Sequence, residues 1–378
     1  MTQTTLLIAA FLGTFMFGVF SAFWGMIVPE IEKKVGKAAT ILLANSLGLV
    51  VGSIISGPTI DQMGNKVALA AGIGLVAVGV FVLGRVSSMA GGFVMALLVG
   101  VGGSAIVTAA NTLVQDVATT DAARGFWGNT INNFFAVGAF IAPIFLARFI
   151  AGGMTLRKIS TMLGTLCVLV FVYYLVIGFP PPKAAGSDMT AGAGEVMNHS
   201  LFWILALMLF LYVGCEGTVW YWLNKYLTQE LNFSAKAAGN TVSLFAIGII
   251  AGRVISSFLL GQNLMAPLVL TLLGAIGIAV SYTGVLMARE QSTVRLLATL
   301  AGVSMAPLFP TILAAVNIHF TQNTGTAIGL AITGGWLGYV FIPPSIGYVA
   351  QLRKGMFITS AAAIMLVALN LIALSIGR

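Results

Sequence analysis

Long apolar segments alternate with short polar ones along the whole sequence. Each apolar segment is bounded by charged residues, glycine or proline. A helix of roughly 20 apolar residues is long enough to cross the hydrocarbon core of a bilayer. The pattern predicts twelve such spans, at residues 5–28, 38–60, 67–84, 91–115, 126–149, 159–179, 200–227, 237–260, 264–287, 294–318, 326–350 and 356–376.

The longest polar interruption falls near the middle of the chain. Residues 180–199 open with consecutive prolines and are rich in Gly, Ala and Ser, a composition typical of linkers. The predicted architecture is an all-α membrane protein, with one six-helix bundle at 1–179, the linker at 180–199 and a second bundle at 200–378. The first apolar segment has no basic region before it and is longer than the core of a signal peptide, so we expect it to be a span.

Glycine and proline recur at an offset of 200 residues between the two halves. The matches are Gly52/Gly252, Gly102/Gly302, Gly125/Gly325, Gly138/Gly338 and Pro143/Pro343. Two parallel six-helix repeats with a binding site between them at mid-depth are typical of one large class of transporters.

Composition excludes other classes of protein. Only 7% of residues are charged and 59% are apolar, whereas a soluble domain carries about a quarter of its residues as charges. Cys167 and Cys215 lie within apolar runs, and His199 and His319 are isolated, so no metal site, cofactor or catalytic constellation is expected. Neither a P-loop nor a nucleic-acid partner is indicated.

The segment from Gly57 to Lys66 carries a spaced motif. It reads Gly57-Pro-Thr-Ile-Asp61-Gln-Met-Gly64-Asn-Lys66 and resembles the G-x-x-x-D-x-x-G-x-[RK] loop of the major facilitator superfamily. Gly57 permits close helix approach, Asp61 can accept from a helix N-terminus or a basic partner, and Gly64 makes the turn. We assign these residues and Lys66 to gating. The resemblance implies a monomer in a bacterial-type inner (plasma) membrane with both termini in the cytoplasm.

Short motifs in both halves resemble the fucose and glucose-galactose permease branch of that superfamily. They are Ala109-Ala110-Asn111, Tyr212-Val-Gly214-Cys-Glu216, Gly252-Arg253, Phe309-Pro310-Thr311-Ile312 and Gly334-Gly335. The resemblance implies transport of a sugar or related small solute, commonly together with a proton. Two acids of the branch's proton-coupled members are replaced here by Gly25 and Val107, and the F-N-x-x-G of helix five becomes Phe134-Phe135-Ala-Val-Gly138.

Two ionisable residues are predicted to lie deep in the membrane. Such groups are costly there and are functional candidates for that reason. Glu216 is the candidate proton carrier, which implies at most one coupled proton per cycle; the alternative is a hydrogen-bonded acid that fixes helix packing, with uniport as the result. Arg253 is a candidate gate or packing residue, and the alternative is a clamp for an anionic substrate.

Aromatic and amide side chains are the candidate substrate ligands, because ring faces stack on sugars while amides bond their hydroxyls. The predicted set is Trp24, Asn111, Asn133, Trp220, Tyr221, Asn224 and Trp336. The alternative for the tryptophans is an interfacial belt.

The charge distribution opposes the orientation that the family resemblance implies. The net charge is +8, and most Lys and Arg residues fall in loops assigned to the outside, against the positive-inside rule. A basic outer face can concentrate an anionic substrate, or mark an unusual lipid partner. An organic-anion carrier or uniporter therefore remains an alternative. So does an efflux antiporter for amphipathic compounds, although Ala142, Leu146 and Ala147 depart from that class's helix-five signature.

Overall fold

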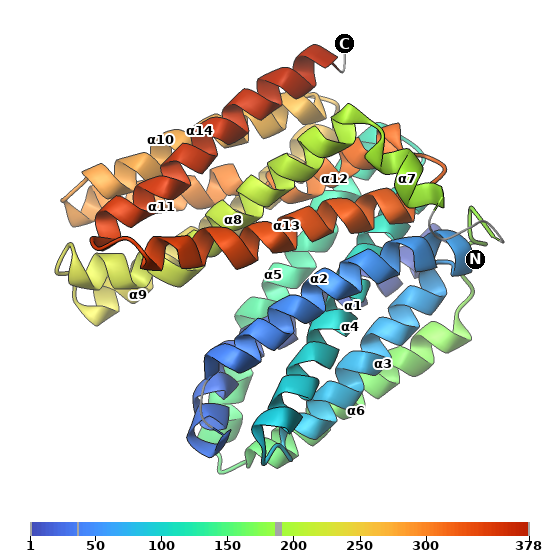
Figure 1. The fold of residues 1–378 in the computed structure, drawn as a ribbon, viewed down its shortest axis with the longest axis horizontal. Coiled ribbons are helices and arrows are strands. Elements are labelled where there is room, and N and C mark those ends of the chain that lie inside the picture. Colours follow the sequence, from blue (N-terminus) through green and yellow to red (C-terminus); the bar gives the residue numbers. More distant parts are fainter. Residues whose placement is uncertain (1, 36–37, 186–190, 377–378) are drawn as a thin grey trace. The chain divides into compact units, whose positions relative to one another are not determined.

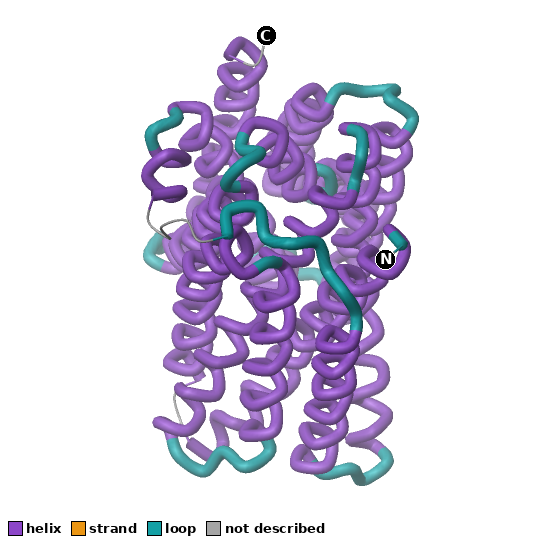
Figure 2. The backbone as a smooth tube through the Cα atoms, turned by 90° about the vertical axis from the view of Figure 1, so that its right-hand side faces the viewer, coloured by secondary structure: helices purple, strands orange, loops and turns teal. Residues whose placement is uncertain are grey.

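The computed structural model describes the backbone of residues 2–35, 38–185 and 191–376, and the side chains of these except 23–39 and 191. Helices joined by short loops make up the described residues, and no strand occurs among them (Figure 2). The predicted all-α class is confirmed.

Fourteen helices follow one another in the described residues, in the order labelled in Figure 1. They are α1 (Gln3–Val35), α2 (Ala38–Met63), α3 (Asn65–Leu83), α4 (Met89–Val117), α5 (Asp121–Ala151), α6 (Leu156–Val176), α7 (Ala191–Met197), α8 (Ser200–Gln229), α9 (Ala235–Gly261), α10 (Pro267–Met287), α11 (Gln291–Met305), α12 (Leu308–His319), α13 (Thr324–Gly347) and α14 (Leu352–Ile376).

Twelve segments of the described chain are long and apolar enough to cross a membrane, which confirms the predicted number. The tenth is a broken helix: α11 ends at Met305 and α12 begins at Leu308. Pro307 lies at the break, because proline lacks a backbone N–H and clashes with the preceding turn. The short helix α7 lies within the predicted linker.

Contacts divide the chain into two compact units that do not follow the sequence halves strictly. Unit 1 comprises residues 1–118, 131–196 and 320–333, and unit 2 comprises 119–130, 197–319 and 334–378. The first turns of α13 thus pack within unit 1, and the first turns of α5 within unit 2. Both helices carry the glycine of the 125/325 match.

Glycines allow close packing of the central helix pair in each unit. In unit 1 a Cβ on Gly52 of α2 would lie 2.9 Å from Val101 Cα of α4. In unit 2 a Cβ on Gly252 of α9 would lie 2.9 Å from Val303 Cα of α11. The same contact is therefore built twice, which supports the internal repeat.

The repeat offset is not constant, and one predicted match is wrong. Gly102 packs against the Gly72 carbonyl, and the corresponding contact in unit 2 joins Gly274 to Ser304. Gly302 instead packs against the start of the Phe245–Ile249 turn, as Gly100 packs against Asn45–Leu49. The offset is 200 from α2 to α9 and 202 from α4 to α11, so Gly302 corresponds to Gly100.

A second pair of close contacts joins the helices that carry most candidate residues. In unit 1, Gly138 of α5 faces the Phe15 carbonyl of α1. In unit 2, Gly338 of α13 faces the Phe210 carbonyl of α8, and α8 and α13 run alongside each other in Figure 1. Any side chain at these glycines would meet backbone of the neighbouring helix.

Candidate functional site

The centre of α8 presents an acid between two hydrogen-bond donors. Tyr212, Glu216 and Trp220 are spaced four residues apart and therefore share one face of the helix. The Tyr212 hydroxyl donates to Glu216 Oε2 at 2.6 Å, and Trp220 Nε1 donates to Oε1 at 3.4 Å. Tyr212 is buried while Glu216 is partly accessible. The other described acids all lie within a few residues of a helix end, so Glu216 alone of them stands in mid-span.

Arg253 adds a positive charge to this cluster. It lies in α9 and is only 4% exposed. Its guanidinium lies close enough to the Tyr212 hydroxyl to act on it by charge. Tyr212 thus connects the Glu216 carboxylate with the Arg253 guanidinium. A buried cation costs free energy unless it has polar partners, and Tyr212 is such a partner for Arg253.

Aromatic rings lie on this face and on the adjoining side of α8. Trp220 is 45% exposed and meets Phe245 of α9 edge to face, with ring centroids 5.2 Å apart. Tyr221 is 54% exposed and meets Tyr339 of α13 at 6.5 Å. Ring faces with accessible edges can stack on the apolar face of a sugar.

The remaining candidates of unit 2 are Trp336 in α13 and Asn224 in α8. Trp336 is one helical turn before Tyr339 in α13 and is partly accessible. Asn224 is exposed on α8, one turn after Trp220, and stands closer to the end of that helix.

The two candidate amides of unit 1, Asn111 and Asn133, differ in their hydrogen-bond partners. Asn132 Nδ2 donates to Asn111 Oδ1 at 3.2 Å, and Asn111 Nδ2 donates to the Val107 carbonyl at 2.9 Å. Asn133 is half-buried, and its Oδ1 has no hydrogen-bond partner in the structure. The backbone of Trp24 lies in α1, but its side chain falls outside the described residues.

The motif at 57–66 holds the end of α2 against the beginning of α13, within unit 1. The two carboxylate oxygens of Asp61 accept the backbone amides of Gly325 and Thr326, each at 2.7 Å. Asp61 is only 4% exposed, and Gly57 lies so close to Gly325 that a Cβ would come within 2.8 Å of its carbonyl oxygen. Of the two partners predicted for Asp61, the structure has the helix N-terminus.

The other two motif residues fix the turn and the next helix. Gly64 adopts φ of 86°, a left-handed conformation that favours glycine. Lys66 Nζ donates to the Leu175 carbonyl at the end of α6, at 2.7 Å.

Two residues that sequence reasoning did not single out complete this network. Lys183 of the linker pairs with Asp116 at 2.6 Å and donates to Thr324 Oγ1 at 3.2 Å. The Asp61 carbonyl accepts the next linker amide, Ala184 N, at 2.9 Å. The linker therefore contacts α2, α4 and the beginning of α13. The only sequence signal was a lone lysine after the proline run.

Known proteins of this architecture provide an independent comparison. The profile of the Major Facilitator Superfamily matches residues 6–343. A Xenopus laevis protein named sodium-dependent glucose transporter 1 is 26% identical over 363 residues, covering 88% of this chain and 71% of the relative. The E. coli fucose:proton symporter FucP superposes with a TM-score of 0.81 at 17% identity, covering 99% of each chain. The human organic anion transporter MFSD10 superposes with a TM-score of 0.79 at 14% identity, covering 98% of this chain and 100% of that one.

The profile match spans nearly the whole chain, and the twelve apolar helices are those of an integral multi-pass membrane protein. The chain belongs to the Major Facilitator Superfamily.

Proposed function

We propose that this protein is a secondary transporter that moves a small polar solute, a sugar or a related compound, by alternating access. The observation that carries the proposal is the α8 face, where Glu216 stands in mid-span beside the accessible rings of Trp220 and Tyr221. Acids in mid-membrane mark ion or substrate pathways, and rings beside polar groups suit polyhydroxy ligands. The names of the glucose transporter and the fucose symporter among the similar proteins support the same solute class.

Glu216 is the proposed coupling residue. Tyr212 and Trp220 donate to its two oxygens and hold the carboxylate in position, while its partial accessibility leaves a route for proton exchange. A single acid carries at most one proton per cycle. Its loss should leave a uniporter, because the aromatic face remains.

The proposed substrate ligands are Trp220, Tyr221, Asn224 and Trp336 in the second half of the chain, and Trp24, Asn111 and Asn133 in the first. Asn133 is favoured among the amides of unit 1, because its Oδ1 is left without a partner while Asn111 is already bonded to Asn132. An unsatisfied buried acceptor costs free energy that a substrate hydroxyl would recover.

The contact of Asp61 with the first turn of α13 is the proposed gate. Gly57, Gly64 and Lys66 shape it, and Arg253 is the proposed gating residue in α9. The Asp61 bonds are charge-assisted but few, so they can hold one state and still break during a cycle. We also propose a monomer in a bacterial-type plasma membrane with both termini in the cytoplasm.

An organic-anion carrier is the second candidate. Arg253 favours it, because a buried guanidinium next to Tyr212 can bind a carboxylate that enters the same face. If the protein carries anions, Arg253→Gln should abolish their flux. If it carries sugars, the same variant should still bind the sugar.

Counterflow in liposomes tests the proposal. Purified protein is reconstituted, loaded with one unlabelled solute and exposed to the labelled form, with hexoses, sugar acids and small carboxylates in separate trials. We expect transient accumulation of a hexose or related sugar, abolished by Trp220→Ala with Tyr221→Ala. Accumulation of carboxylates alone supports the anion carrier. No counterflow with any solute contradicts transport of this class.

A further inference from the structure

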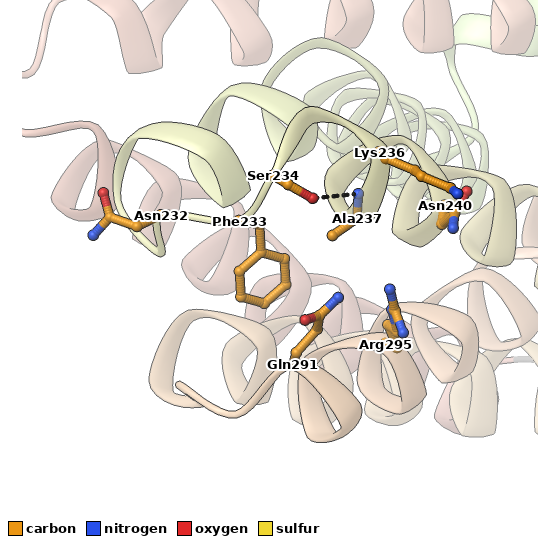
Figure 3. Close-up of a pocket in the computed structure, with 8 residues that line it drawn as sticks. All are labelled: Asn232, Phe233, Ser234, Lys236, Ala237, Asn240, Gln291 and Arg295. Carbon is orange, nitrogen blue, oxygen red and sulfur yellow. Dashed lines mark hydrogen bonds between the residues drawn. The ribbon is translucent and has the colours of Figure 1, made fainter.

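A cavity of about 460 Å³ opens in unit 2 between the beginnings of α9 and α11 (Figure 3). None of its lining residues belongs to the α8 face, and its helical lining residues lie in the first two turns of the spans that begin at residues 235 and 291. Its lining is polar apart from Phe233 and Ala237. The lining residues are Asn232, Phe233, Ser234, Lys236, Ala237, Asn240, Gln291 and Arg295.

Two helix N-termini meet at this cavity. α9 and α11 run parallel, because Gly248 packs at Thr299 and Gly252 packs at Val303. The first residues of the helices, Ala235 and Gln291, are therefore at the same end. The N-terminus of a helix carries about half a positive charge, so both helices make the cavity attractive to anions.

Each helix adds a cation and an amide. Lys236 and Asn240 are four residues apart on α9, and Gln291 and Arg295 are four residues apart on α11. In Figure 3 Arg295 points from α11 toward Asn240 and Lys236 across the opening. The four side chains thus present positive charge and N–H donors to one space.

The described part of the chain supplies no acid to pair with these two cations. Among the described residues neither Lys236 nor Arg295 forms an ion pair, and Arg295 Nε is buried without a hydrogen-bond partner. Two other cations at this end contact groups of the protein. Arg353 Nε donates to the Leu286 carbonyl at 2.9 Å, and Lys225 Nζ lies 5.0 Å from the centre of the Trp222 ring.

Glu290, the acid next to Gln291, forms its hydrogen bonds within the first turn of α11. Glu290 precedes α11, and its carboxylate accepts the hydroxyls of Ser292 and Thr293, which lower its pKa. It is fully exposed and does not line the cavity. The Glu290 carboxylate therefore bonds residues of its own helix and does not pair with Arg295.

We propose that this cavity binds a phosphate group, either free in solution or in the head group of an anionic phospholipid. A guanidinium bonds phosphate oxygens in pairs, an ammonium and the positive ends of two helices add charge, and two carboxamides supply further donors. Both helices begin where their apolar spans begin, at residues 235 and 291, so a lipid head group can reach the same donors as a soluble anion.

Calorimetry on the whole 378-residue chain, purified free of lipid in non-ionic detergent, tests this site. One titration uses inorganic phosphate and a second uses dihexanoyl-phosphatidylglycerol. The variant Lys236→Gln/Arg295→Gln removes both cations and keeps their hydrogen-bonding shape. The control Lys225→Gln/Lys354→Gln removes the same charge from the same end of unit 2 without touching the cavity.

We expect saturable binding to the unaltered protein and to the control, and a dissociation constant at least about tenfold higher in the cavity variant. Binding of both probes supports a phosphate site open to solution, and binding of the lipid alone supports a head-group site. No saturable binding of either, or equal weakening in the control, overturns the proposal. If the double variant does not fold, Asn240→Asp puts a negative charge on the exposed rim and should weaken the same binding.

Discussion

Asp61 accepts the backbone amide of Gly325 at 2.7 Å, across 264 positions of sequence. Thr326 donates its amide to the second carboxylate oxygen at the same distance. First-turn amides have no partner within their own helix, so Asp61 acts as the N-terminal cap of α13 although it belongs to α2. One residue thereby joins the first half of the sequence to a helix of the second.

Replacing Asp61 by Ala should expose these two amides. Without the carboxylate they are protected only by packing, and a lost bond to a charged group corresponds to about 1.5–3 kcal/mol. Hydrogen–deuterium exchange of a peptide covering residues 320–330 should become roughly tenfold faster or more. Asp121→Asn, which removes an exposed carboxylate paired with Arg124, is the control and should change nothing there. Unchanged exchange in Asp61→Ala would show that the cap contributes little.

Gly338→Ala should destabilise the α8–α13 pair. Its added methyl would lie 2.7 Å from the Phe210 carbonyl carbon, and backbone cannot move aside cheaply. We expect a loss of about 1–3 kcal/mol in the free energy of unfolding, seen as a lower melting temperature in detergent. Gly239→Ala is the matched control, because nothing lies within 4 Å of its added methyl. That change should be neutral or stabilise α9 by up to about 1 kcal/mol.

Lys183 and Asp116 should show measurable coupling in a double-mutant cycle. The pair is 2.6 Å apart, with side-chain exposures of 39% and 13%, and Lys183 also reaches Thr324. We expect a coupling free energy of about 1 kcal/mol from the cycle of Lys183→Met and Asp116→Asn. The pair Arg124–Asp121, three residues apart with Asp121 63% exposed, should give about 0.3 kcal/mol. Equal values for both pairs would argue that the linker is not anchored by this bond.

Tyr212→Phe should weaken coupled transport without unfolding the protein. It removes the shorter of the two donors to Glu216, at 2.6 Å, and leaves the ring in place. We expect uptake driven by a pH gradient to fall about tenfold, while exchange of the solute at equal pH continues. Tyr174→Phe removes an equally buried hydroxyl, bonded to the Ala9 carbonyl in unit 1, and should spare coupling. Equal losses in both variants would assign Tyr212 to packing.

The sequence predicts the helices well because each must be apolar over a fixed length. The predicted span 237–260 becomes α9 at Ala235–Gly261, and the twelve spans are all present. The break at Pro307 was missed because the apolar run continues through it. Helix ends also extend beyond the spans, as in α5, which begins at Asp121 rather than 126.

Contacts between distant segments were harder to foresee. The match Gly102/Gly302 arose because the chain holds 45 glycines, so equal spacing alone does not identify equal partners. Only the packing of Gly102 on Gly72, and of Gly302 on the Phe245 turn, distinguishes them. The motif around Asp61 predicted a helix N-terminus or a basic residue as its partner, and spacing does not specify which of the two or which helix. Lys183 lies in a linker, and the composition of a linker does not indicate which residues it contacts. Its pairing with Asp116 could therefore not be derived from the sequence.

Solute-dependent proton entry into liposomes is the most direct test of Glu216-coupled sugar transport. Purified protein is reconstituted with a pH dye inside, and hexoses, sugar acids and small carboxylates are added singly while internal pH is followed. The account predicts acidification with a hexose or related sugar, lost in Glu216→Gln and retained in the control Asp121→Asn. A silent dye while labelled solute still exchanges, or acidification that persists in Glu216→Gln, would contradict it.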